Sequence, residues 1–227
     1  MPVGELNFAV PTLFGLEGLC ADEIRRLGLP SVQAENGRVL CTGTEGDLPR
    51  LNLNLRTGER VLLVLGTFPA GNFDALFEGT RALPWERFIP REGQFPVKGH
   101  SLNSALHSVP ACQSIVKKSV AARLGEAYGL NTLPETGALY QIQFAIMKDT
   151  ATLMLDTSGA GLHKRGYRAQ GVIAPLRETL AAAMVLLSRY RGRDPLCDPF
   201  CGSGTIPIEA ALIARNRAPG LNRSFSA

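Results

Sequence analysis

Leu196-Cys197-Asp198-Pro199-Phe200-Cys201-Gly202-Ser203-Gly204-Thr205 is the stretch that decides the fold, and apolar residues continue from it to Ile213. A short apolar segment here ends on an acidic residue and is followed by a turn with two glycines and the start of a helix. Such a turn brings backbone N–H groups close to a ligand. We therefore expect a cofactor-binding loop.

Three nucleotide-type interpretations compete for this loop. A phosphate-binding P-loop needs a lysine after its last glycine, and Thr205 stands there instead. A dinucleotide-binding turn needs a third glycine, which is missing after Gly204. The S-adenosylmethionine loop of class I methyltransferases needs only the acidic residue and the glycine turn, and both are present. A glycine turn without a ligand is the structural alternative.

The loop, together with the run Ile206-Pro207-Ile208-Glu209-Ala210-Ala211, closely resembles motif I of the THUMP-domain RNA guanine-N2 methyltransferases of the large ribosomal subunit. Residues 174–183 also resemble the segment that precedes motif I in that family, which implies cofactor contact by Leu176, Glu178 or Thr179. The resemblance implies S-adenosyl-L-methionine as cofactor. The expected contacts come from Asp198, Cys201, Gly202, Ser203, Gly204 and Thr205. Cys201 is expected as a small loop residue and not as a nucleophile.

Composition indicates a soluble globular protein: the chain has 227 residues, 45% hydrophobic and 19% charged. Because no apolar run reaches the roughly 18 residues that span a bilayer, we expect no membrane partner. The amino terminus lacks the basic start of a signal peptide, which favours the cytoplasm. Five scattered cysteines without a CxxC pair argue against disulfides and a metal site. A net charge of +4 is compatible with a nucleic-acid partner without requiring one.

Residues 1–68 are predicted to form a ferredoxin-like domain with the order βαββαβ. The Asn36-Gly37 pair predicts a hairpin turn, and Asp47 is expected to cap a helix that runs to about Leu55. The other expected elements are a strand over 6–10, a helix over 16–27, a strand over 38–42 and a buried strand over 61–68.

Residues 69–157 are predicted to form a THUMP RNA-binding domain. We expect a strand near 95–98, a helix after Pro110 and an antiparallel strand pair around Lys148-Asp149. Residues 95–101 and 108–118 resemble a THUMP domain, which implies RNA binding. Phosphate contacts are expected from Lys98, His100, Lys117 and Lys118. The alternative is that these are ordinary solubilising side chains.

Residues 158–173 are interpreted as a glycine-rich linker with a basic cluster of Lys164, Arg165 and Arg168. Lys164 and Arg165 are expected to join the RNA-binding set. Residues 174–227 are then the start of a methyltransferase domain. Its first helix is expected to have Pro175 in the first turn and to bury a stripe of apolar residues, namely Leu176, Leu180, Ala183, Met184 and Leu187.

The expected fold class is therefore α+β and α/β: a ferredoxin-like unit and a THUMP domain, then the truncated start of a Rossmann-like class I methyltransferase domain. Only about 30 residues follow Asp198, against the ~100 or more of an α/β domain. The family's catalytic Asn-Pro-Pro-Tyr/Phe motif is absent, so no catalytic residue is assigned. We expect the amino-terminal part of a longer protein, inactive alone, with an apolar face that promotes self-association.

For the whole protein the resemblance implies methyl transfer from S-adenosyl-L-methionine to guanine N2 of large-subunit (23S) rRNA. The base would be drawn out of its helix into the pocket. Structured RNA, in particular large-subunit rRNA, is the expected partner. Two alternatives remain: an RNA-binding module without catalysis, and a DNA adenine-N6 methyltransferase. The modified nucleotide and the oligomeric state are left open.

Overall fold

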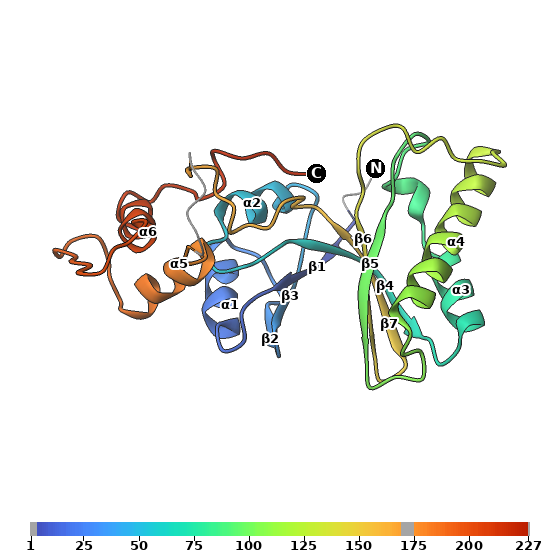
Figure 1. Ribbon diagram of the computed structural model, residues 1–227, viewed down its shortest axis with the longest axis horizontal. Coiled ribbons are helices and arrows are strands. Elements are labelled where there is room, and N and C mark those ends of the chain that lie inside the picture. Colours follow the sequence, from blue (N-terminus) through green and yellow to red (C-terminus); the bar gives the residue numbers. More distant parts are fainter. Residues whose placement is uncertain (1–3, 169–174, 227) are drawn as a thin grey trace. The chain divides into compact units, whose positions relative to one another are not determined.

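The computed structural model describes residues 4–168 and 175–226, which form two compact units. The first unit joins the described residues up to Val61 with those from Ser158 to Phe225, and the second runs from Leu62 to Thr157 (Figure 1). In these described ranges, no helix has the length and apolar character needed to cross a membrane.

The first unit contains a small antiparallel sheet in the order β2-β3-β1. Its strands are β1 (Leu6–Pro11), β2 (Gln33–Glu35) and β3 (Arg38–Gly43). Phe8 lies opposite Cys41 and Val10 opposite Val39, and all four side chains are buried. Alternation along each strand thus builds one apolar face, as the sequence predicted.

Two helices complete this part of the core: α1 (Glu17–Arg26) buries Cys20 and Ile24, and α2 (Asp47–Asn54) buries Leu51. The expected cap of α2 differs by one position. Asp47 is the first helical residue, and its carboxylate accepts hydrogen bonds from the backbone N–H and the hydroxyl of Thr44, both at 2.9 Å. The side chain therefore stabilises the turn that leads into the helix.

The second unit has a four-stranded sheet in the order β4-β7-β6-β5. The strands are β4 (Leu62–Pro69), β7 (Thr150–Asp156), β6 (Ile142–Met147) and β5 (Val97–Leu102). β5 pairs parallel to β6, whereas the other pairs are antiparallel. The β6–β7 pair and its tight turn at Lys148 and Asp149, both with positive φ, confirm the sequence prediction.

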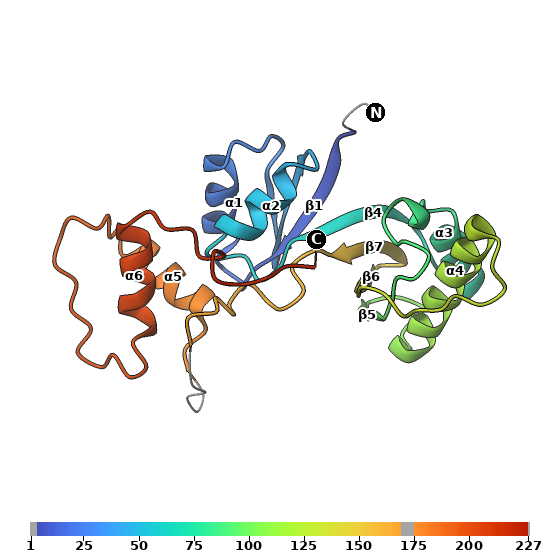
Figure 2. The ribbon, with the colours of Figure 1, turned by 90° about the horizontal axis from the view of Figure 1, so that it is seen from above.

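Helices α3 (Phe73–Arg81) and α4 (Val109–Tyr128) lie on the same side of this sheet, and a 3₁₀ turn, η1 (Trp85–Arg87), follows α3 (Figures 1 and 2). The sheet buries Phe144 and Leu153 in this unit. α3 was not among the elements expected from the sequence, although its cap is a standard one: the Asn72 side chain accepts from the N–H of Ala75 at 2.8 Å.

The carboxyl-terminal part of the first unit consists of α5 (Glu178–Leu187) and α6 (Thr205–Ala214), which pack against each other. Pro175 precedes α5 and is not in its first turn. The predicted buried stripe is wrong in part: Ala183 is buried as expected, but Met184 and Leu187 are 46% and 61% exposed. The buried side of α5 carries mostly small residues, Ala181 and Ala182 next to Ala183, which allow α6 to approach closely.

No strand forms at Leu196–Asp198, although an acidic residue at the end of a strand was expected there. A β-strand requires a hydrogen-bonded neighbour. The described residues of this unit provide none for the segment, which therefore runs as an extended connection from α5 to the loop.

Candidate functional site

The candidate cofactor loop, residues 198–205, forms a sharp turn that ends at the first turn of α6. Gly202 and Gly204 have φ of +51° and +72°, in the left-handed region that favours glycine. Asp198 closes the turn, since its carboxylate accepts from the N–H of Phe200 at 3.1 Å. The Gly204 N–H donates to the carbonyl of Cys201 at 2.7 Å.

Both glycines face open space. A Cβ built on Gly202 would have the Phe200 carbonyl as its nearest neighbour, at 3.9 Å, and one on Gly204 would meet Ile208 only at 3.8 Å. A ligand can therefore approach the backbone closely at this turn. The amino-terminal end of α6 adds a positive partial charge, which suits an anionic group such as a carboxylate. These features fit the amino-acid end of an S-adenosylmethionine-type cofactor.

All six residues predicted to bind the cofactor lie in this loop, but their side chains differ in access. Cys201 is exposed, Asp198 is half-buried and Thr205 is 3% exposed. Asp198 also lines a cavity of about 500 Å³ between the loop and α5. Other lining residues are Met184, Val185, Leu196, Cys197 and Ile206.

The side chains of Ser203 and Thr205 are engaged by the protein itself. Their hydroxyl oxygens lie 3.1 Å apart, and both accept from the guanidinium of Arg168, Ser203 at 3.3 Å and Thr205 at 2.8 Å. The same guanidinium binds the Glu178 carboxylate at 2.5 Å and the Leu176 carbonyl at 3.1 Å. Glu178, proposed from the resemblance as a cofactor contact, is thus buried and paired with Arg168.

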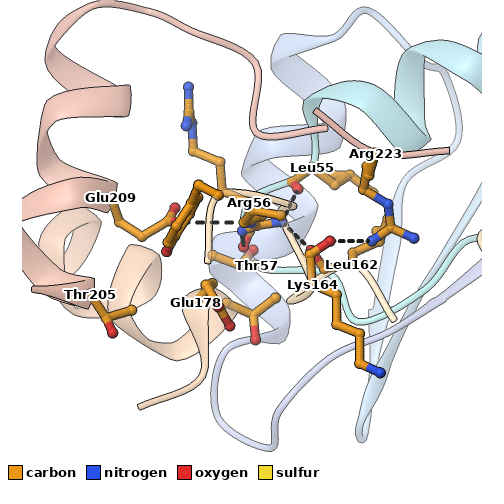
Figure 3. Close-up of polar contacts among 12 residues, drawn as sticks. Leu55, Arg56, Thr57, Leu162, Lys164, Glu178, Thr205, Glu209 and Arg223 are labelled. Atoms are coloured by element: carbon orange, nitrogen blue, oxygen red, sulfur yellow. Dashed lines mark hydrogen bonds and ion pairs between the residues drawn. The ribbon is translucent and has the colours of Figure 1, made fainter. Parts of the chain in front are cut away.

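Arg165 is buried, which corrects its expected role in RNA binding. Its side chain is 2% exposed, and its terminal nitrogens donate to the carbonyls of Leu162, Leu55 and Arg56 at 2.7, 3.3 and 2.6 Å. Its Nε lies 3.5 Å from a carboxylate oxygen of Glu209 on α6 (Figure 3). A guanidinium with these partners has no surface left for an RNA phosphate.

Glu209 is fully buried and anchors the linker to α6. It accepts from the Tyr167 hydroxyl at 3.1 Å in addition to its ion pair with Arg165. Burial raises the pKa of Glu209, while the Arg165 charge opposes that shift. Burial also raises the pKa of Tyr167. A single acidic residue within an otherwise apolar helix is the sequence feature that could have indicated this role.

A second carboxylate, that of the partly buried Glu59, holds the start of α5. It accepts from the Thr179 hydroxyl at 2.6 Å, and His163 Nδ1 lies 3.5 Å from its other oxygen. Partial burial lowers the pKa of His163, and the negative charge of Glu59 opposes the shift. Thr179, another residue expected near the cofactor, is therefore a structural contact between Glu59 and α5.

The residues predicted to bind RNA in the second unit lie on two sides of β5. Lys98 and His100 share its exposed face. Lys117 and Lys118 of α4 line a separate cavity of about 510 Å³, whose wall includes Val97, from the opposite face of the strand. The structure therefore brings these residues together in pairs.

Lys117 is held in place by neighbouring groups. Its ammonium lies 2.5 Å from the Glu135 carboxylate, 3.3 Å from the Phe95 carbonyl and 3.5 Å from the centre of the Phe95 ring. Lys118, by contrast, is exposed, as is Lys164 in the first unit. These two lysines retain the access that a phosphate contact needs.

Three known domain families match the chain in succession. Residues 7–62 match the RlmL ferredoxin-like domain, residues 70–156 the THUMP domain, and residues 165–227 the UPF0020 family, described as an RMKL-like methyltransferase domain. The three matches together place a ferredoxin-like domain, a THUMP domain and a methyltransferase-family segment one after another along this chain. Its fold class is accordingly a ferredoxin-like domain and a THUMP domain followed by part of a class I methyltransferase domain.

Two curated relatives are similar to the chain over most of its length. The chain is 48% identical over 213 residues to the "Putative RNA methyltransferase YpsC" of Bacillus subtilis, matching 93% of this chain and 55% of that protein. It is 37% identical over 217 residues to "Ribosomal RNA large subunit methyltransferase K/L" of Syntrophotalea carbinolica, matching 93% of this chain and 30% of that protein. The chain thus spans about half or less of these relatives' length.

Two solved structures are very similar. One is a "predicted N6-adenine-specific DNA methylase" from Listeria monocytogenes, with a TM-score of 0.94 and 50% identity, covering 98% of this chain and 59% of that one. The other is "SMU.472, a putative methyltransferase complexed with SAH", with a TM-score of 0.93 and 42% identity, covering 100% of this chain and 60% of that one.

Proposed function

We propose that this chain is the RNA-binding and partial cofactor-binding portion of an S-adenosylmethionine-dependent RNA methyltransferase. The observation that carries the proposal is the loop of residues 198–205, whose two left-handed glycines leave the backbone open next to the start of α6. A THUMP domain on the same chain supports RNA as the substrate class. The solved relative in complex with SAH supports the cofactor.

In this proposal, the loop backbone and Asp198 hold the cofactor, and the exposed lysines position the RNA. The cofactor supplies an activated methyl group when bound, so the chain's main task is to orient the two reactants. Lys98, His100 and Lys118 would contribute phosphate contacts that depend on salt concentration. Lys117 and Lys164 complete the proposed RNA-binding set, from which the buried Arg165 is removed.

The finer substrate in this proposal is guanine N2 of large-subunit rRNA. The relative named for large-subunit rRNA methylation supports this choice. The competing candidate is adenine N6 of DNA, the activity for which the Listeria protein is named. The THUMP domain argues for RNA, because a duplex-DNA enzyme has no evident use for it. A third candidate is RNA binding without methylation.

The test uses the whole protein from which this chain comes, purified and supplied with radiolabelled S-adenosylmethionine. Protein-free large-subunit rRNA and duplex DNA are offered separately, and the modified nucleosides are identified by mass spectrometry. We expect N2-methylguanosine in the rRNA and no label in the DNA. N6-methyladenine in the DNA would refute the proposal, and RNA binding without label in either substrate would support the third candidate.

A further inference from the structure

Among the described basic residues of the linker, Arg168 is the one whose guanidinium hydrogen-bonds to side chains of the candidate cofactor loop. One nitrogen binds Glu178 at the start of α5, another binds Ser203 in the glycine turn, and the third binds Thr205 at the start of α6 as well as the carbonyl of Leu176.

We propose that Arg168 is a positioning residue for the cofactor loop, an inference that rests on the proposed function. The loop glycines make its backbone permissive, so something outside the turn must select one conformation. Arg168 does so by holding the Ser203 and Thr205 hydroxyls on either side of Gly204. Its own position is fixed by the buried Glu178, which is 5% exposed.

The planar guanidinium suits this role better than any other cation. It presents donors in several fixed directions and remains charged at every physiological pH. A lysine ammonium is a compact charge, and at this position it can keep the ion pair with Glu178 but cannot span the Leu176 carbonyl and both hydroxyls. The chemistry therefore predicts that Arg168→Lys folds but leaves the loop less ordered.

The neighbouring linker residues strengthen the argument. Arg165 and Tyr167 both bind Glu209, in the second turn of α6. Arg168 then binds the first residue of the same helix, Thr205. Linker residues 165–168 thus bind α6 in its first and second turns. These contacts fix the position of the amino-terminal end of α6 relative to α5.

The experiment combines hydrogen exchange with cofactor affinity. Exchange of the loop amides, residues 200–205, is measured by mass spectrometry in wild type, Arg168→Lys and Arg168→Met. The control is Arg215→Met, which removes an exposed arginine at the other end of α6. Dissociation constants for S-adenosylhomocysteine are measured by calorimetry in the same four proteins. Peptides from α4 report whether the rest of the fold is intact.

We expect the loop amides of both Arg168 variants to exchange about tenfold faster, and both variants to bind S-adenosylhomocysteine about tenfold more weakly. Amide exchange in α4 should not change, and the Arg215→Met control should match wild type in both measurements. Unchanged loop exchange in a folded Arg168 variant would overturn the inference. A wild-type chain that does not bind S-adenosylhomocysteine would refute its proposed cofactor binding instead, and the exchange data would still decide the role of Arg168.

Discussion

Replacing Glu209 by alanine removes the carboxylate that holds the linker to α6. The Glu209 and Arg165 atoms are 3.5 Å apart. At an effective dielectric constant of about 20, charges at this separation interact by about 5 kcal/mol. Removing one partner of a buried pair typically costs about 3 to 5 kcal/mol, because the other charge remains buried. Loss of the Tyr167 hydrogen bond adds about 1 kcal/mol. We expect Glu209→Ala to lower the free energy of unfolding by at least about 3 kcal/mol.

Urea unfolding followed by far-ultraviolet circular dichroism measures this loss. The control is Glu126→Ala, which breaks an exposed ion pair with Arg81 and should cost less than about 1 kcal/mol. In a double-mutant cycle with Arg165→Met, the two losses should be strongly non-additive, because either change alone breaks the same pair. The reasoning is refuted if Glu209→Ala costs no more than the exposed control, or if the two losses simply add.

Three further predictions concern other parts of the molecule. The Arg123 guanidinium holds the pKa of Glu86 below its usual value. The ionised Glu86 carboxylate therefore stabilises the fold fully above the ordinary glutamate pKa, and this stabilisation is lost as pH falls through the lowered pKa of the folded protein. Stability to urea, followed by the fluorescence of the single tryptophan, should fall more steeply on acidification in wild type than in Glu86→Gln; parallel profiles would contradict this. Gly99→Ala places a Cβ 2.3 Å from the Phe144 carbonyl, so its thermal midpoint should fall with a loss of about 1 to 3 kcal/mol, and an unchanged midpoint would count against the β5–β6 packing. Leu187→Lys should weaken the binding of an apolar dye and reduce concentration-dependent association in light scattering, because the leucine is 61% exposed; unaltered dye fluorescence would show that this surface is not the apolar patch.

The strands and hairpins were predictable because their patterns are local. Every second residue of β6, Ile142, Phe144 and Ile146, is a buried apolar one, and the turn that follows carries Lys148 and Asp149, an arrangement that a short sequence window contains. The turn at Gly202 and Gly204 was predictable for the same reason, because closely spaced glycines before an apolar run indicate a turn that leads into a helix.

The parts that were missed depend on contacts between distant residues. α5 is apolar on nearly all sides, so periodicity could not show that Ala182 is buried and Met184 is exposed. Arg165 lies in a glycine-rich linker, where a basic residue is normally solvated. Its burial depends on Glu209 and on carbonyls of residues 55 and 56, which no local pattern relates to it.

The most direct test of the proposed cofactor site is a calorimetric titration of this chain with S-adenosylmethionine, alongside Asp198→Ala. Asp198 closes the loop through the Phe200 N–H and lines the adjacent cavity. We predict saturable binding by the wild-type chain and loss of binding in a variant that remains folded by circular dichroism. Equal binding by both proteins would contradict the placement of the cofactor on this loop. An absence of binding by a folded wild-type chain would contradict the claim that these residues form a cofactor site on their own.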